Sequence, residues 1–262
     1  MQLPLLRLRQ LDNRQTISED DCLSLITKSL RKGEGFFHLW IGYTGWGKSV
    51  ANSILCTFLK QHGCMTIVID QKNKDCIYPG EQIVSVRELP DVKSSQVVIR
   101  GAAMTTKASD IVVCDDVARD VWTIGQSANV TVCLMPDELT DASKNQEWKV
   151  RKQRLSRSTA TIHNAMSDND PWMDKLYCQG RVLGICIAAA TQLVQSVPRS
   201  ALAMSGTMGI FRQRGRELAY LERLGYLDKM SSQIVSNLAI GEFLLTQRGE
   251  EPKVCKFDYS GT

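Results

Sequence analysis

Residues 42–49 read GYTGWGKS, and no other segment limits the possible folds of this chain as strongly. The segment has glycine, glycine, lysine and serine at the spacing of a phosphate-binding loop. It follows the apolar run FFHLWI at 36–41, which is typical of a strand buried on both faces of a sheet, and it precedes a helical pattern at 50–61. The sequence therefore predicts a strand, a phosphate-binding loop and a helix in direct succession.

The residues of the loop indicate which groups would contact a nucleotide. Its glycines carry no Cβ, so successive backbone N–H groups can turn toward phosphate oxygens. Lys48 would neutralise the β- and γ-phosphates, and Ser49 would be a ligand of Mg²⁺. The alternative is a glycine-rich turn that carries Lys-Ser by chance, and the flanking strand and helix argue against it. We expect ATP and Mg²⁺ as cofactors, with nucleotide contacts from Gly42, Tyr43, Thr44, Gly45, Trp46, Gly47, Lys48, Ser49 and Val50.

The rest of the chain has the pattern of one α/β domain. A second buried-strand pattern, CMTIVID at 64–70, completes a β–α–β unit. Segment 110–126 mixes strand and helix signals, and we interpret it as a helix. Further strands are expected at 97–100, 129–135, 181–191, 208–212 and 242–246, and helices at 215–224 and 229–238. This alternation predicts a single α/β domain, a sheet with helices on both faces. Together with the phosphate-binding loop, it resembles the P-loop NTPases of the RecA-like (ASCE) class.

The same patterns suggest the limits of that domain. Residues 1–35 are expected to form an N-terminal helical extension, in which Ser18 caps a helix over 18–30. The P-loop ATPase domain is expected at 36–250, with a C-terminal tail at 251–262.

An NTPase of this class also needs a carboxylate at the end of a neighbouring strand for Mg²⁺, and a base that orients water. Asp137 and Glu138 follow the strand expected at 129–135, so we assign Asp137 to the metal and Glu138 to the attacking water. Asp115 and Asp116 form a competing pair within the segment interpreted as helix. The alternative for either pair is a solvated strand end, and of the two pairs we favour Asp137 and Glu138.

Gln192 follows the strand expected at 181–191. Ligands in open α/β sheets bind at the carboxyl ends of the strands, so Gln192 would contact the γ-phosphate or the attacking water. A glutamine in this place can also be a helix cap or a hydrogen-bonded loop residue.

Composition excludes several classes of protein. Nine cysteines, an odd number with no CxxC pair, indicate reduced thiols in a reducing compartment rather than a disulfide framework. The longest uncharged apolar run is too short to cross a bilayer, so we expect a cytoplasmic protein. A net charge of +4 is too small to indicate a nucleic-acid partner by itself.

Several segments together resemble the HerA–FtsK superfamily of DNA-pumping ATPases. They are GYTGWGKS, IDQKNKD at 69–75, Asp-Glu at 137–138, GICIAAATQLVQSVPRSAL at 184–202 and LAIGEFLLTQRG at 238–249. The phosphate-binding loop is specific only for NTPases, whereas the Thr-Gln strand after Asp-Glu points to this branch. Asp-Gln-Lys in place of the more usual Asp-Pro-Lys, and Pro136 before the acidic pair, mark a divergent sequence.

The resemblance implies an ATPase that forms a homo-oligomeric ring, commonly a hexamer, with double-stranded DNA in its channel. The compact chain is most similar to the small genome-packaging ATPases of tailless internal-membrane viruses. The implied function is packaging of a viral double-stranded DNA genome into a preformed capsid, with docking to a capsid vertex or membrane protein. Other DNA pumps of conjugation or helicase type, a P-loop kinase or nucleotide switch, and a protein that uses ATP only to close a ring remain as alternatives.

A ring of this type needs an arginine that reaches a neighbouring subunit's nucleotide. Arg212 is our first candidate, ahead of Arg199, Arg214 and Arg216, and it joins Lys48, Glu138 and Gln192 in the expected catalytic set. The basic segment 144–157 would track DNA phosphates, or else form a solvated helix face. Its expected DNA contacts are Lys149, Arg151, Lys152 and Arg154.

Overall fold

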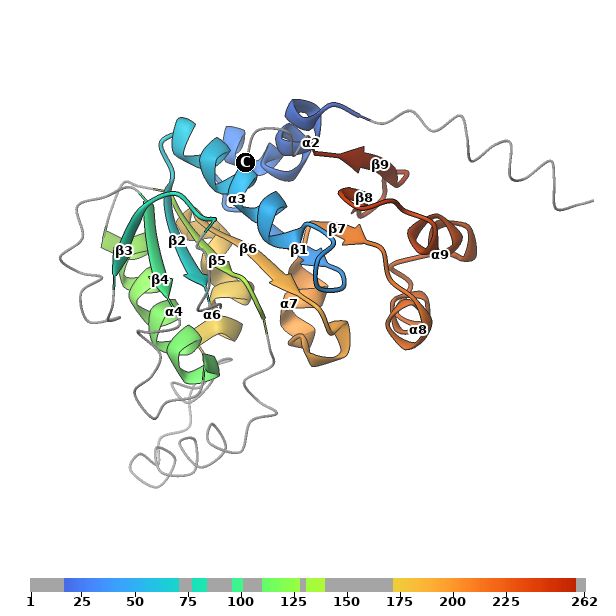
Figure 1. The fold of residues 1–262 in the computed structure, drawn as a ribbon. Coiled ribbons are helices and arrows are strands. Elements are labelled where there is room, and N and C mark those ends of the chain that lie inside the picture. The colour runs from blue at the N-terminus through green and yellow to red at the C-terminus, as the bar shows by residue number, and fades with distance from the viewer. Residues whose placement is uncertain are drawn as a thin grey trace, which may run out of the picture.

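A computed structural model describes residues 17–70, 77–83, 96–100, 110–127, 131–139 and 172–257. Within these ranges the strands form one nine-stranded sheet in the order β3-β4-β2-β5-β6-β1-β7-β8-β9 (Figure 1). The strands from β3 through β7 in this order are parallel, and β8 and β9 are antiparallel to their neighbours. Their bounds are β1 Phe37–Ile41, β2 Met65–Asp70, β3 Glu81–Ile83, β4 Gln96–Arg100, β5 Val132–Pro136, β6 Ile185–Thr191, β7 Thr207–Phe211, β8 Glu242–Gln247 and β9 Lys253–Lys256.

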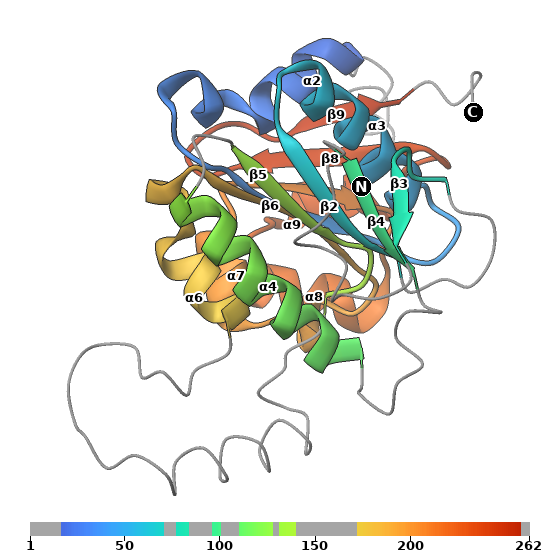
Figure 2. The same ribbon diagram turned by 90° about the vertical axis from the view of Figure 1, so that its left-hand side faces the viewer.

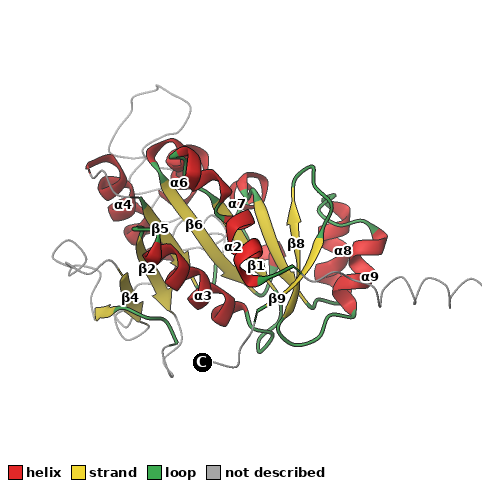
Figure 3. Cartoon of the chain, turned by 90° about the horizontal axis from the view of Figure 1, so that it is seen from above, coloured by secondary structure: helices red, strands yellow, loops and turns green. Residues whose placement is uncertain are grey.

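Helices cover both faces of the sheet (Figures 2 and 3). On one face lie α2 (Glu19–Ile26) and α3 (Lys48–Gln61), and on the other lie α4 (Asp110–Ser127), α6 (Trp172–Gln179), α7 (Arg199–Met204), α8 (Gly215–Arg223) and α9 (Lys229–Ser236). Short 3₁₀ turns occur at Lys28–Lys32, Gly180–Leu183 and Val194–Ser196. The predicted α/β P-loop fold with helices on both faces is confirmed.

The two helical layers explain why the central strands are buried at every position and mostly apolar. In β1, Phe37, Leu39 and Ile41 pack against the α4 and α7 side, whereas Trp40 packs against the α3 side. All residues of β1, β5 and β6 are buried. A strand covered on both faces loses the polar alternation of an exposed sheet, which is why continuous apolar runs identified these strands in the sequence.

Most of the strands and helices were predicted with small errors at their ends. Segment 110–126 is helical, as interpreted, and Ser18 caps α2 by accepting a hydrogen bond from the Asp21 N–H at 3.1 Å. The helix expected over 18–30 ends as an α-helix at Ile26 and continues as a 3₁₀ turn. The strand expected at 181–191 begins only at Ile185, because Gly184, at φ 71°, closes a 3₁₀ turn before it.

The strand β9 was not expected from the sequence. It pairs with β8, and Cys255 within it bridges Ile17, which brings both ends of the described chain to one edge of the sheet. The Phe243 ring of β8 makes a T-shaped contact with Trp40 and a tilted contact with Phe257, with ring centroids 5.2 and 5.0 Å apart. Such aromatic pairs contribute roughly 0.5–1.5 kcal/mol each beyond their burial, so they help to fix this edge.

The order of the central strands places the functional segments. Because β6 lies between β5 and β1, the three segments after these strands emerge side by side at one edge of the sheet. They begin at Gly42 after β1, at Asp137 after β5 and at Gln192 after β6. Strand β2 is parallel to β1 but is separated from it by β5 and β6, so α3 crosses over two strands. Among the described residues, no helix is long and apolar enough to span a membrane.

Candidate nucleotide-binding site

The phosphate-binding loop has the backbone that its sequence predicts. A Cβ on Gly42 would lie 2.6 Å from the Cβ of Phe211, so only glycine allows the loop to leave β1 this close to β7. Gly47 has φ 103° and caps the N-terminus of α3, which begins at Lys48. The first N–H groups of α3 and the positive end of its dipole therefore face the loop, an arrangement that favours an anion.

A cavity of about 250 Å³ lies in front of this helix end. It is bounded by the segments that follow β1, β5 and β6. Its lining residues are Thr44, Gly45, Gly47, Lys48, Ser49, Val50, Asp137, Glu138 and Gln192. The lining thus brings together the lysine, the serine, the acidic pair and the glutamine that the sequence indicated from three separate segments.

Lys48 and Ser49 present their polar groups from the first turn of α3. Lys48 is 7% exposed, and its Nζ donates to the carbonyl oxygen of Tyr43 at 2.9 Å. The Ser49 hydroxyl donates to the two carboxylate oxygens of Asp137 at 2.9 and 3.2 Å. A hydroxyl and a buried carboxylate at this distance are hard oxygen ligands of the kind that Mg²⁺ takes, so these residues fit the expected metal.

Asp137 and Glu138 occupy different environments. Asp137 is 4% exposed, and its N–H donates to the Ile69 carbonyl at 3.0 Å, which ties it to β2. One Glu138 oxygen accepts from the Thr191 hydroxyl at 3.2 Å and from the Gln192 N–H at 3.1 Å. Burial raises the pKa of Glu138 above its ordinary 4.5, while these two donors and Lys48 oppose the rise. A carboxylate with a raised pKa is a better proton acceptor, as a base that activates water requires.

Gln192 connects the acidic pair to the phosphate-binding loop. Its side-chain oxygen accepts from the Thr44 hydroxyl at 2.7 Å, and its backbone carbonyl accepts from the buried Gln213 amide at 3.4 Å. Gln192 therefore lines the cavity and connects the loop after β1 to the loop after β7. Its position matches the sequence expectation of a polar group at the strand tip.

Several predicted residues lie outside the lining of the cavity. The Tyr43 hydroxyl donates to the Arg214 carbonyl at 3.1 Å. The Arg212 guanidinium lies over the Trp46 ring of its own chain, 5.1 Å from the ring centroid. These contacts, with Gly42 against Phe211, fasten the phosphate-binding loop to the segment after β7. The other candidate arginines, Arg199, Arg214 and Arg216, are exposed.

The sequence also indicated a set of DNA-contact residues and a competing acidic pair. Lys149, Arg151, Lys152 and Arg154 lie outside the described residues. The competing acids Asp115 and Asp116 lie within α4, not after a strand.

Tyr78 is a member of this site that sequence reasoning missed. Its hydroxyl donates to the Oδ1 atom of Asp137 at 2.8 Å. It lies 59 residues before Asp137 and belongs to no motif, so only the packing of the segment after β2 brings the two together. No signal in the sequence pointed to this contact.

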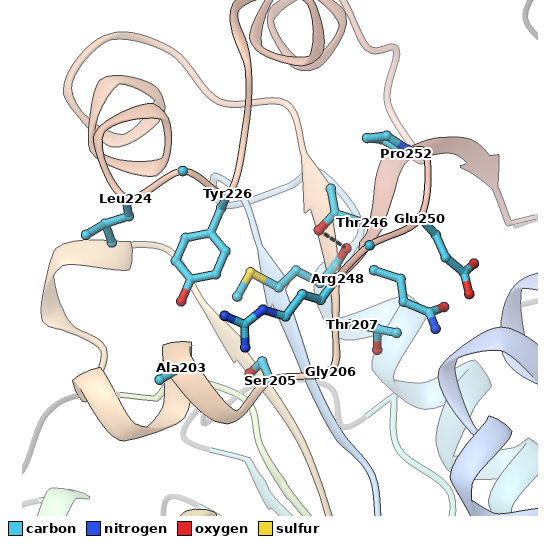
Figure 4. Close-up of a pocket in the computed structure, with 14 residues that line it drawn as sticks. Ala203, Ser205, Gly206, Thr207, Leu224, Tyr226, Thr246, Arg248, Glu250 and Pro252 are labelled. Carbon is cyan, nitrogen blue, oxygen red and sulfur yellow. Dashed lines mark hydrogen bonds between the residues drawn. The ribbon is translucent and has the colours of Figure 1, made fainter.

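A larger cavity, about 430 Å³, lies elsewhere among the described residues, at the amino end of β7 (Figure 4). The Arg248 side chain extends across it toward Ser205 and Tyr226. The hydroxyls of Ser205, Tyr226 and Thr246 donate to the backbone carbonyls of Ala201, Leu202 and Met208. Their protons are therefore already engaged, and this cavity lacks the glycine loop and helix N-terminus that receive phosphates.

Comparisons with known proteins agree on the fold. No protein-family model matches the chain, and neither does any curated protein. Among solved structures, the DNA-packaging ATPase B204 of Sulfolobus turreted icosahedral virus matches with a TM-score of 0.60 and 17% identity, over 87% of this chain and 98% of that one. B204 of Sulfolobus turreted icosahedral virus 2, a genome-packaging NTPase in complex with AMPPCP, matches at 0.58 and 16%, over 84% and 96%.

A third solved structure extends the likeness beyond viruses. VirB4 of Thermoanaerobacter pseudethanolicus matches with a TM-score of 0.62 and 11% identity, over 86% of this chain and 90% of that one. At identities of 11 to 17%, these matches show the fold alone. The chain shares the α/β P-loop ATPase fold of B204, the fold class that the sequence predicted.

Proposed function

We propose that this protein binds ATP with Mg²⁺ in the 250 Å³ cavity and hydrolyses it. The observation that carries the proposal is the convergence of five side chains there. Lys48 and Ser49 open a helix directly opposite the acids Asp137 and Glu138, and Gln192 lies over the remaining side. A structural glycine turn would not require a buried lysine, a serine–carboxylate pair, a second carboxylate and a glutamine on three adjacent strand ends.

Each residue has a defined task in this proposal. Lys48 exchanges the Tyr43 carbonyl for phosphate oxygens, while the N–H groups of the loop donate to the same phosphates. Ser49 and Asp137 would hold Mg²⁺, which supplies positive charge beside the β- and γ-phosphate oxygens. Glu138 orients a water molecule and accepts its proton. Gln192 and Thr44 form a hydrogen-bonded pair that a γ-phosphate would contact first.

We propose further that hydrolysis drives movement of double-stranded DNA, in the manner of a genome-packaging motor. This part is supported by the fold and by size, since this chain aligns with 98% of a DNA-packaging ATPase chain. A homo-oligomeric ring, a hexamer in the simplest case, would hold DNA in its channel, with the basic segment 144–157 toward the phosphates. A capsid vertex or membrane protein would dock the ring.

The test is the ATPase rate of the purified protein with and without double-stranded DNA, together with the particle mass in solution. We expect Mg²⁺-dependent hydrolysis and a rate that rises several-fold with DNA. We also expect a particle mass several times the 29.3 kDa of one chain. Charge reversal at Arg151, Lys152 and Arg154 should remove the DNA stimulation and leave basal hydrolysis intact. A DNA-insensitive monomer would support a P-loop kinase or nucleotide switch instead.

A further inference from the structure

We propose that Tyr78 is a positioning residue that fixes the Asp137 carboxylate for Mg²⁺ binding. This inference rests on the proposed nucleotide function and deepens it, because it concerns the same site. It assigns a role to a residue that belongs to none of the motifs of the phosphate-binding loop or the acidic pair.

The contact is specific to one carboxylate oxygen. Tyr78 donates to Oδ1 of Asp137 at 2.8 Å, and Ser49 donates to the same oxygen at 2.9 Å. Two hydroxyls therefore approach Oδ1, one from the phosphate-binding helix and one from the segment after β2. Asp137 is 4% exposed and Tyr78 is 5% exposed, so water replaces neither contact easily.

The Tyr78 segment is attached to the same helix that carries Ser49. Ser53, one helical turn after Ser49, donates to the carbonyl of Ile77 at 2.9 Å. Residues four apart share one face of a helix, so α3 presents Ser49 to Asp137 and Ser53 to the chain beside Tyr78. The ring of Tyr78 packs in the core beneath α3. Tyr78, Asp137 and the start of α3 are thus held in fixed relation.

The Tyr78 hydroxyl remains a donor at every physiological pH. A tyrosine hydroxyl ordinarily ionises only near pH 10, so this side chain keeps its proton under such conditions. A neutral phenol can donate a hydrogen bond to the Asp137 carboxylate, whereas a phenolate has no O–H and could not. The contact with Asp137 is therefore available whether or not a metal is present.

Tyr78 matters most when the metal binds. A serine that turns its oxygen toward a cation must give up or weaken its own hydrogen bond to the carboxylate. The Tyr78 hydroxyl can then continue to donate to Asp137 and hold its carboxylate in the same orientation. Loss of such an outer hydrogen-bond partner typically weakens metal binding by roughly 10- to 100-fold. We expect about a tenfold loss, since aspartate at such sites acts partly through bound water.

The experiment compares Tyr78→Phe with Tyr226→Phe. Each change removes one tyrosine hydroxyl that donates a hydrogen bond. The bond of Tyr78 is buried, whereas that of Tyr226 is partly buried and goes to Leu202 at the opposite end of the sheet. Affinity for a fluorescent ATP analogue is measured in EDTA and across a Mg²⁺ titration, and bound Mn²⁺ is counted by electron paramagnetic resonance. Tyr78→Phe should raise the half-saturating Mg²⁺ and Mn²⁺ concentrations about tenfold, with affinity in EDTA unchanged. Tyr226→Phe should match the parent protein.

Other outcomes separate the alternatives. An unchanged metal titration in Tyr78→Phe overturns the proposal, and so does an equal loss of affinity with and without metal, which indicates a purely structural role. If Tyr78→Phe does not fold, Ser53→Ala decides, because it releases the Tyr78 segment from α3 and should shift the metal titration in the same direction by a smaller factor. A parent protein whose nucleotide affinity ignores Mg²⁺ would instead refute the proposed function itself.

Discussion

The two ends of the parallel strands differ in a way that cavity size does not reveal. The amino end carries the larger cavity, about 430 Å³, beside β7 and β8, whereas the carboxyl end carries one of about 250 Å³. At the amino end, hydroxyl groups donate to nearby backbone carbonyls and stabilise the local chain. At the carboxyl end, Lys48, Glu138 and Gln192 face a common space from three strand ends.

This difference follows from strand direction. In a parallel sheet the segments that leave the carboxyl ends of neighbouring strands meet, and the helices that begin there point their N-termini toward the same space. The amino ends instead receive chain from helix C-termini. The larger cavity at the amino end is therefore a gap between packed elements, whereas side chains from several strand ends line the smaller cavity at the carboxyl end. We therefore expect chemistry at the carboxyl end and stability at the amino end.

The largest expected effect comes from removal of one cation at each end. Lys48→Ala should lower nucleotide affinity and reduce hydrolysis about 1000-fold, because the charge opposite the phosphates is lost from a buried position. Arg248→Ala removes a cation that spans the larger cavity and should leave hydrolysis unchanged. Steady-state ATPase assays and fluorescent-nucleotide titrations measure both.

The paired design also controls for folding. Arg248 is exposed, so its replacement should change the free energy of unfolding by no more than about 0.5 kcal/mol. If Arg248→Ala impaired hydrolysis as strongly as Lys48→Ala, the assignment of chemistry to the carboxyl end would be wrong.

Glu138→Gln tests the chemical step alone. The amide keeps the shape of the side chain but cannot accept a proton, so the rate of hydrolysis should fall about 100-fold while ATP affinity is retained. In the parent protein the rate should fall as pH drops through the pKa of Glu138, which burial raises above 4.5. This acidic limb of the pH–rate profile should be absent from the variant. Hydrolysis at the parental rate would remove Glu138 as the base.

The sequence predicted the part of the site that depends on local order. A glycine loop needs its own strand and helix, so GYTGWGKS fixed both neighbours and the positions of Lys48 and Ser49. The acidic pair and Gln192 were placed by one further rule, that strand ends of a parallel sheet meet at one edge. These inferences required only the approximate positions of strands, which long apolar runs show well.

Contacts between distant segments were beyond that reasoning. Tyr78 reaches Asp137 because the chain after β2 packs beneath α3, and Arg212 reaches Trp46 because β7 lies next to β1. Both contacts depend on the order of the strands in the sheet, which the sequence patterns do not reveal. β9 was missed for a related reason: a four-residue strand at the edge of a sheet has too few residues to show a period. Its pairing is fixed by β8 and the aromatic contacts of Phe243 and Phe257.

The smallest expected effect concerns stability at the amino end and uses His38. This residue of β1 is 1% exposed, and its Nδ1 lies 2.7 Å from the Thr207 hydroxyl oxygen at the start of β7. Burial lowers the pKa of His38 from 6.5 to about 3. Between these values the unfolded chain binds a proton that the folded chain does not, so stability is full above pH 6.5 and decreases as pH falls toward 3. From pH 7 to pH 5 the loss should be about 2 kcal/mol.

Urea unfolding of the parent protein and of His38→Asn at both pH values isolates this contribution, because the other titrating groups are common to the two proteins. Asparagine can retain a polar atom near Thr207 but does not titrate. From pH 7 to pH 5, the free energy of unfolding of the variant should therefore fall by about 2 kcal/mol less than that of the parent protein. Nucleotide affinity at neutral pH should be similar in both, since His38 lies toward the amino end of β1 and the phosphate-binding loop begins after its carboxyl end. Equal acid sensitivity would mean that the imidazole is accommodated in its charged form, and that the amino end does not have the stabilising role that the comparison gives it.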